Sequence, residues 1–313
     1  MDRTGKLVIQ PQFEICRDFE EGIASVGTGS VDGYLKEGFI DSKGQYVVNP
    51  IYFSTGPFAE GLARVCTGDG SSQGITIQGC GFVDRNGKLT IETKFQASYD
   101  FSDGLAKVDI RGRGEYCEYI DKAGSIVLSK NIGGTCQSFK DGLAPIEVNG
   151  KWGYMDKTGN VAIAPQFEGA FQFEEGLAAV RKDARFGFID KTGNVVIPFK
   201  FTGARSFSDG MALVYLDNVP KAGFIDRAGN TVIVPQFDAA ESFSEGLAVV
   251  RLGSKYGFID KSGKVVVSPQ FSKAMSFNGG LAEVEVDGDG SFKKGNKKGY
   301  IDRIGKIVWQ PSS

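Results

Sequence analysis

Short apolar and β-branched runs, separated by turn residues, recur along the whole chain. Residues 152–180 read WGYMDKTGNVAIAPQFEGAFQFEEGLAAV, in which GYMD, NVAIA and GLAAV are each short and β-rich. Asp156 and Gly159 stand at the first and last positions of a type I turn, so GYMD and NVAIA are predicted to form an antiparallel hairpin. GLAAV is predicted to pair on the other side of that hairpin. Pro165 opens a fourth, less regular segment, which we expect to be a bend or a strand edge.

Two motifs of this stretch repeat at intervals of about 34 to 43 residues. The turn D-x-x-G occurs nine times, with its glycine at Gly5, Gly44, Gly87, Gly124, Gly159, Gly193, Gly229, Gly263 and Gly305. The motif F-x-x-G-[LIM]-A occurs eight times, with its glycine at Gly22, Gly61, Gly104, Gly142, Gly176, Gly210, Gly246 and Gly280. Because the two motifs alternate strictly, the chain contains eight units and one additional hairpin limb.

Four short segments per unit predict an all-β fold of β-propeller blades that close into a ring. The alternative is an open β-solenoid of three-stranded units. Either way, residues 1–313 are predicted to form a single repeat domain. The limbs at residues 1–10 and 303–313 are the same element, so one completes the last unit and the other is spare.

The units differ most in the connection between the GLAxV strand and the GFID strand. This connection is short in the middle units, for example at residues 181–185, and longer at residues 27–37, 66–80, 109–116 and 287–298. Repeat proteins collect insertions on one face, which is often the binding face. We therefore predict a binding rim formed by these loops together with the Pro-Gln-Phe connections. The candidate binding residues on it are Arg111, Arg113, Tyr116, Lys293 and Lys294.

Two sets of carboxylates recur with the repeats. The turn aspartates are expected to cap their own turns, because an active site needs one or two special carboxylates and not nine alike. They are Asp2, Asp41, Asp84, Asp121, Asp156, Asp190, Asp226, Asp260 and Asp302. The second set is expected to cap turns or to be solvated, with a charged ring that recruits a basic partner as the alternative. It comprises Glu21, Glu60, Asp103, Asp141, Glu175, Asp209 and Glu245, with Gly279 in the last unit.

Most units contain two aromatic residues at fixed positions, which we predict to fill the core between neighbouring sheets. Stacking on sugars or bases is the alternative for such a series. One series precedes the strand glycine by three residues: Phe19, Phe58, Phe101, Phe139, Phe173, Phe207, Phe243 and Phe277. The other comprises Phe13, Tyr52, Phe95, Phe167, Phe201, Phe237 and Phe271.

Five cysteines leave one without a partner if the others pair. Cys16 and Cys136 occupy a position that holds alanine in other units, so both are predicted to be small buried residues. Cys66 and Cys80 bracket a long loop and form a candidate disulfide if the compartment is oxidising. Cys117 occupies the same position as Cys80 in the next unit. The sequence contains no C-x-x-C spacing, so a zinc site is not expected.

The run Trp152-Gly153-Tyr154-Met155-Asp156, with Pro165-Gln166-Phe167 and Glu175-Gly176-Leu177-Ala178 behind it, resembles the bacterial WG repeat family. The resemblance covers nearly all of residues 1–313. It implies a bacterial β-repeat array that mediates interactions. The family's tryptophan is present in one unit, and elsewhere its position holds Glu37, Cys80, Cys117, Phe186, Ala222, Tyr256 and Lys298. The glycine after it becomes Glu118 in one unit. The GFIDKTGNVVI hairpin is also similar to the outer hairpin of quinoprotein-type propeller blades, without implying their cofactor.

The amino-acid composition excludes several classes of catalytic site. The chain has no histidine, which excludes Ser-His-Asp, Cys-His and HExxH sites, and it has no phosphate-binding glycine motif. The run at Asp287 begins like a calcium loop, but Lys298 stands where the final glutamate is needed. We therefore expect no catalytic residue, metal or cofactor. A glycosidase that uses two carboxylates stays open, although the off-pattern Glu92, Glu118 and Glu283 come from different units.

These observations predict a non-enzymatic scaffold that binds another protein through the irregular loops of one rim. The alternatives are a glycan-binding protein, a carboxylate-dependent glycosidase and a plain structural spacer. A net charge of −2 with both signs interspersed does not imply nucleic acid, and no apolar run is long enough to insert into a membrane. The chain starts halfway through a repeat, so we expect upstream sequence to be missing. The sequence therefore leaves open whether the protein is cytoplasmic or exported.

Overall fold

The structure is a computed structural model that describes residues 2, 4–29, 34–71, 74–110, 112, 116–217, 219–286 and 297–309. These residues form 32 strands in eight sheets, and each sheet is a four-stranded antiparallel blade in which chain order and spatial order agree. The all-β, eight-repeat β-propeller class is therefore confirmed, and three-stranded solenoid units are not formed. The described residues contain no helix that could span a membrane.

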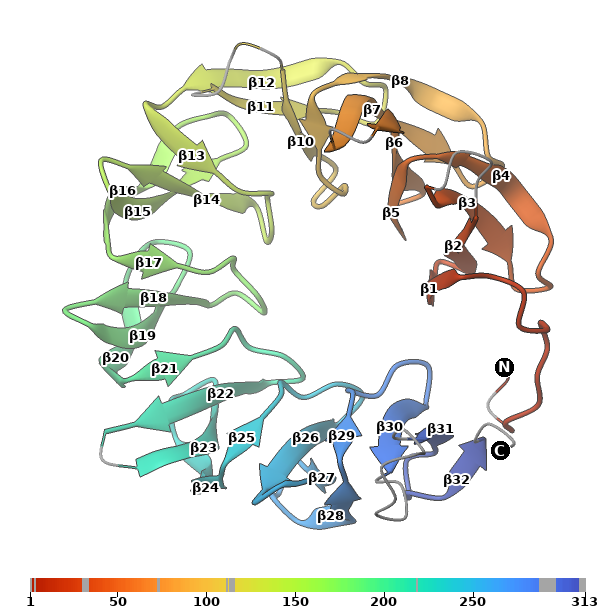
Figure 1. Cartoon of the computed structure of the whole chain (residues 1–313). Helices are drawn as coiled ribbons and strands as arrows, with labels where there is room; N and C mark the ends of the chain where they lie inside the picture. The colour runs from red at the N-terminus through yellow and green to blue at the C-terminus, as the bar shows by residue number, and fades with distance from the viewer. Residues whose placement is uncertain are drawn as a thin grey trace. The chain divides into compact units, whose positions relative to one another are not determined.

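The chain divides into two compact units, residues 8–166 and residues 1–7 with 167–313. Each unit contains four blades, and the first and fourth strands of each blade form its two edges, which we call the inner and the outer strand (Figure 1). The blades of the unit of residues 8–166 are β1 (Ile15–Glu20), β2 (Ile23–Thr28), β3 (Lys36–Asp41) and β4 (Tyr46–Tyr52); β5 (Ser54–Ala59), β6 (Leu62–Ser71), β7 (Gly74–Asp84) and β8 (Leu89–Phe95); β9 (Ala97–Ser98), β10 (Ala106–Asp109), β11 (Tyr116–Ile120) and β12 (Ile126–Asn131); and β13 (Gly134–Cys136), β14 (Leu143–Val148), β15 (Lys151–Asp156) and β16 (Val161–Phe167).

The other unit begins where β16 ends. Its blades are β17 (Gly169–Ala170), β18 (Ala178–Lys182), β19 (Arg185–Ile189) and β20 (Val195–Phe201); β21 (Gly203–Ala204), β22 (Met211–Leu216), β23 (Val219–Asp226) and β24 (Thr231–Phe237); β25 (Ala239–Ala240), β26 (Leu247–Leu252), β27 (Lys255–Asp260) and β28 (Val265–Phe271); and β29 (Lys273–Ala274), β30 (Ala282–Val286), β31 (Lys297–Ile301) and β32 (Ile307–Trp309).

The fourth segment of each repeat differs from the expectation. Pro165 does not begin a separate segment, because it lies inside the outer strand β16, and the next blade begins with the two-residue strand β17. In the last blade the outer strand is β32, which pairs with β31. The C-terminal limb therefore completes this blade, and residues 4–10 form no strand.

Aromatic residues fill the interior between consecutive blades of each unit. Phe58 packs edge-on against Phe39 of the preceding blade, with ring centroids 5.1 Å apart, and Phe243 packs in the same way against Phe224 at 4.8 Å. These rings are almost completely buried, so the described members of both aromatic series belong mainly to the core. Phe19 is the clear departure from that prediction, since 43% of it is exposed.

Candidate functional site

The turn aspartates are bound to their own turns. The Asp156 Oδ1 atom accepts the backbone N–H groups of Thr158 and Asn160, both at 2.9 Å, and the Thr158 hydroxyl at 2.6 Å. The Thr158 hydroxyl holds the pKa of Asp156 below its ordinary value, and the Asn160 N–H adds to this effect. All nine turn aspartates accept the same two N–H groups. No group of three His, Cys, Asp or Glu residues able to hold a metal occurs in the described part of the chain.

The second acidic set connects neighbouring blades. Glu60 adopts a left-handed φ of 54°, and its carboxylate accepts the backbone N–H of Gly104 in the next blade at 3.0 Å. Lys122 of that blade adds an ion pair at 3.2 Å. The same bond to a glycine N–H is made by Glu21, Asp103, Glu175, Asp209 and Glu245. These acids therefore neither cap their own turns nor form a free anionic ring.

The glycine that follows the tryptophan position faces a bulge in the outer strand. A Cβ on Gly223 would lie 2.7 Å from the carbonyl oxygen of Ile233 and 2.8 Å from the nitrogen of Pro235. Several residues of β24 stand opposite this one glycine, because the register shifts between Ala222 and Phe224. The bulge thus requires a residue without a side chain.

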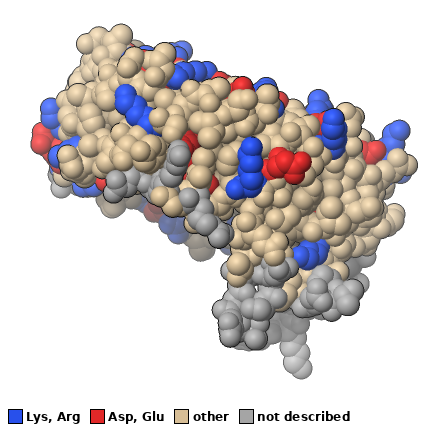
Figure 2. Space-filling model, turned by 90° about the horizontal axis from the view of Figure 1, so that it is seen from above, with Lys and Arg blue, Asp and Glu red and all other residues tan. Residues whose placement is uncertain are grey.

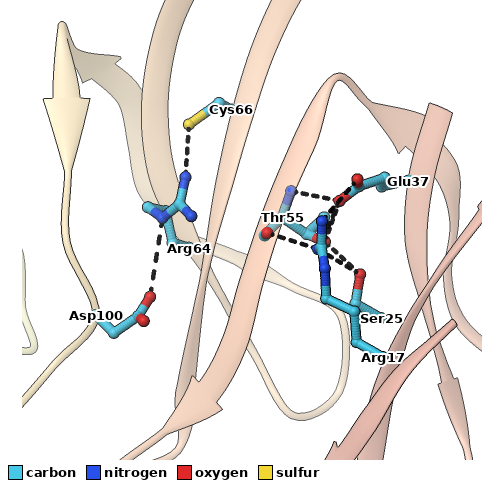
Figure 3. A network of polar contacts seen from close by, with 7 residues as sticks. All are labelled: Arg17, Ser25, Glu37, Thr55, Arg64, Cys66 and Asp100. Carbon is cyan, nitrogen blue, oxygen red and sulfur yellow. Dashed lines mark hydrogen bonds and ion pairs between the residues drawn. The ribbon is translucent and has the colours of Figure 1, made fainter. Parts of the chain in front are cut away.

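The tryptophan position of the first blade carries a buried carboxylate instead of a ring. Glu37 accepts two hydrogen bonds from the Arg17 guanidinium, at 2.9 and 3.0 Å, and two from Thr55, whose N–H and hydroxyl lie 2.8 and 2.7 Å away (Figure 3). The Ser25 hydroxyl also bonds to Thr55 at 2.5 Å. Figure 3 shows a second, smaller cluster one blade further, in which Arg64 lies between Cys66 and Asp100. Burial raises the pKa of Asp100 against the opposing effect of Arg64.

Four of the five cysteines are paired. Cys66 and Cys80 stand opposite each other on β6 and β7 and form a disulfide with an Sγ–Sγ distance of 2.04 Å. Cys136 is buried as predicted, but it is bonded to Cys117 of the preceding blade. Cys16 is free and exposed, so the prediction of burial is wrong for this residue.

The hairpin between the second and third strands lies beside the connection that precedes the first strand. The N–H of Gly29 bonds to Glu14 at 2.7 Å, that of Ala184 to Glu168 at 3.1 Å, and that of Gly253 to Asp238. We call this edge of the blades the rim. The predicted sharing of one rim by these two connections thus holds in the blades where these bonds occur.

Residues 66–80 are not an irregular loop. Strands β6 and β7 continue past the Cys66–Cys80 disulfide as a paired ladder, with Thr67 opposite Gly79, a register shift at Gly68 and Ser71 opposite Gly74. We call residues 67–71 and 74–79 the β6–β7 arm. The arm extends the rim of the second blade with paired strands, which a loop prediction did not foresee.

Tyr116 lines a cavity of about 350 Å³ between the third and fourth blades. It begins β11 and is 38% exposed. Lys107, on the neighbouring strand β10, bonds to Asp109 at 2.8 Å, and its ammonium lies 4.4 Å from the centre of the Tyr99 ring. Thr135 of the fourth blade lines the opposite side. Arg111, Arg113, Lys293 and Lys294 lie outside the described residues, so of the predicted rim residues the structure describes Tyr116.

Two of the off-pattern carboxylates are bonded within their own blades. Glu118 is buried and bonds to the Ser129 hydroxyl on the outer strand of its own blade, at 3.1 Å. Glu283 pairs with Lys298 at 2.8 Å and accepts the Tyr300 hydroxyl. Figure 2 shows lysine, arginine and carboxylate side chains scattered over a largely uncharged face, with no extended patch of one sign.

Comparison with solved structures supports the blade architecture. A eukaryotic initiation factor shares 10% identity at a TM-score of 0.63, covering 98% of this chain and 89% of the other. The dihydro-heme d1 dehydrogenase NirN, in complex with DHE, shares 10% identity at a TM-score of 0.50, covering 96% and 75%. Identities this low show the fold alone.

Comparison with curated protein sequences finds no significant match. The profile of the WG containing repeat, by contrast, matches eight successive segments: residues 1–30, 38–70, 81–113, 119–152, 152–185, 186–219, 223–256 and 256–288. These segments cover most of the chain and follow the repeat that the turn aspartates and strand glycines define. The chain therefore belongs to the WG repeat family and has the fold of an eight-bladed β-propeller.

Proposed function

We propose that this chain is a non-enzymatic scaffold that binds another protein through the rim of the unit of residues 8–166. The observation that carries the proposal is the Tyr116 cavity. It lies on the rim, and Tyr116, which lines it, ends the lengthened connection at residues 109–116. Residues that the repeat preserves are engaged in turns, in inter-blade bonds and in the core.

The chemistry of this surface suits a protein partner. Tyr116 and Tyr99 are exposed rings, and Lys107 and Asp109 place a cation and an anion beside them. Tyrosine is enriched at protein interfaces because it contributes a large contact area and a polar tip. A paired lysine and carboxylate add orientation more than affinity. The β6–β7 arm supplies further ordered backbone on the same rim.

The position of the carboxylates also favours binding over catalysis. Retaining and inverting glycosidases need two carboxyl groups about 5 to 10 Å apart across a substrate cleft. Glu118 and Glu283 are each engaged by a bond within their own blade. The repeated acids are engaged by backbone N–H groups. A non-enzymatic role is thus the simplest account of these contacts.

The experiment identifies a partner by pull-down from the native host and then measures its binding as a purified protein by calorimetry. In one variant, residues 182–185 of the fifth blade replace the β6–β7 arm, and in another Tyr116 is changed to alanine. We expect the dissociation constant to rise at least about tenfold in both variants. Tyr46→Ala is the matched control, because Tyr46 is also an exposed tyrosine, at 48% against 38% for Tyr116, but lies on the outer strand β4. Unchanged affinity in two folded variants would overturn the proposal.

A further inference from the structure

A second concave surface lies in the unit that contains residues 167–313. It is a groove of about 790 Å³ that follows the inner strand β21 of the sixth blade. The side toward the fifth blade carries Phe171 and Phe186, and the sixth blade contributes Tyr215. Ser242 of the seventh blade closes the far end. Its volume lies within the range of small-molecule sites in proteins.

The rings of the fifth blade form an apolar platform in the groove. Phe171 is 43% exposed, and its ring centre lies 6.2 Å from that of Phe186, at an interplanar angle of 41°. The spacing is too small for another ring to fit between the two. A flat ligand therefore cannot insert between the two rings and would contact them from the groove. Phe186 holds the position of the family's tryptophan, so the groove uses a ring that the repeat places at this site.

The aromatic lining is particular to this pair of blades. Three equivalent positions surround each inner strand, and at the groove they hold Phe171, Phe186 and Tyr215. One blade further they hold Arg205, Ala222 and Arg251, and after that Glu241, Tyr256 and Glu285. Phe186 and Tyr215 also pack against the core of their blades, whereas Ala222, Arg251 and Glu285 hold the same positions in later blades. Three aromatic side chains together are thus a property of the groove and not of the fold.

Polar groups border the platform. The hydroxyls of Ser206 and Ser242 line the groove, and neither forms a hydrogen bond with the described residues. Arg205 and Glu241 form an exposed ion pair at 2.5 Å on the same edge. Glu174 also lines the groove, so the lining offers donors and acceptors and a carboxylate beyond this pair. Such a lining disfavours an anionic ligand and suits a neutral ligand with many hydroxyl groups.

From this arrangement we propose that the groove binds a neutral carbohydrate. A pyranose ring has an apolar face of C–H groups that lies flat on an aromatic platform, and a hydroxyl edge that exchanges hydrogen bonds with serine, arginine and carboxylate groups. The groove offers both chemistries side by side. A proline-rich peptide would also contact aromatic rings, but it presents few hydroxyls to Ser206, Ser242 and the Arg205–Glu241 pair.

The test uses the whole chain on an array of neutral and acidic oligosaccharides, followed by titration of the strongest neutral binder. We expect saturation-transfer NMR to show contact with the ring C–H groups of the sugar. Phe171→Ala and Phe186→Ala are each expected to raise the dissociation constant at least about tenfold. Met275→Ala is the matched control, because Met275 holds the position of Phe171 in the eighth blade and is 53% exposed. Its affinity for the sugar should equal that of the wild type.

Three outcomes would overturn the proposal. These are an array without a neutral binder, a binder whose affinity is unchanged by Phe171→Ala, and tighter binding of a decaproline peptide to the same groove. The result is independent of the proposed protein partner, since Phe171 and Tyr116 belong to different units. Loss of sugar binding with an intact Tyr116 surface, or the reverse, separates the two proposals.

Discussion

The backbone N–H of Gly104 donates a hydrogen bond to the carboxylate of Glu60 in the preceding blade, at 3.0 Å. Glu60 holds a left-handed φ of 54°, which costs an L-residue about 1 kcal/mol. The eighth blade has Gly279 at this position, with a φ of 62° and no carboxylate. The hydrogen bond between the blades therefore offsets the free-energy cost of the left-handed backbone at Glu60. A glycine at this position would not have that cost.

These two effects of opposite sign predict the order of stability of variants at Glu60. Glu60→Ala removes the bond and keeps the unfavourable φ, so the free energy of unfolding should fall by about 1 to 2 kcal/mol. Glu60→Gly removes the bond but relieves the backbone, and it should lose less. Urea unfolding measures both. Lys122→Ala, which removes only the exposed ion pair, should change stability by less than about 0.5 kcal/mol. Equal losses for the alanine and glycine variants would contradict the argument.

Gly223 gives a second prediction, on the bulge opposite the tryptophan position. An alanine Cβ there would lie 2.7 Å from the Ile233 carbonyl oxygen, so Gly223→Ala should lower the free energy of unfolding by about 1 to 3 kcal/mol. Gly169→Ala is the control, because its Cβ would meet nothing closer than 3.7 Å. Thermal unfolding of both variants checks the difference. Equal stability of the two variants would show that the bulge yields to a side chain.

Much of the fold could be predicted because its signals are local and repeated. A turn aspartate bonds to N–H groups two and four residues away, so its role is visible within five residues of sequence. The two-residue strand β17 is too short to produce a pattern. The place of Pro165 inside β16 was also not predictable, because it depends on the bulge that faces Gly153 on the neighbouring strand.

The contacts that depend on other strands, in the same blade or in the next one, were not predictable. Glu118 replaces the family glycine because β12 runs opposite it in regular register, with Ser129 directly across. The bond from Cys136 to Cys117 joins two blades, and an odd count of cysteines leaves the pairings open. The position of Tyr116 on the rim follows from the lengthened connection. Its neighbours Lys107 and Thr135 come from separate strands, and no spacing in the sequence indicates them.

The disulfides give a third prediction. Cys66 and Cys80 close a short loop, so the Cys66→Ala/Cys80→Ala variant should lose about 3 kcal/mol of stability by the chain-entropy model. Peptide mapping without reductant should find Cys66 linked to Cys80 and Cys117 linked to Cys136. Iodoacetamide should modify Cys16 alone in the native protein, since it is the free and exposed thiol. Modification of all five cysteines in non-reducing conditions would show that the bonds do not form.

The turn aspartates predict how stability depends on pH. The Thr192 hydroxyl, with the Asn194 N–H, lowers the pKa of Asp190 in the folded state below its ordinary value of 3.8. A carboxyl whose pKa is depressed by folding stabilises the protein above its unfolded pKa, and this contribution is lost as the pH falls through the folded value. Stability should therefore decline between about pH 5 and pH 2, and Asp190→Asn should decline less over this range. Thr192→Ala should move the Asp190 pKa upward in a carbon-13 NMR titration, because it removes the largest cause of the shift. An unchanged titration curve would show that the hydroxyl does not hold this carboxylate.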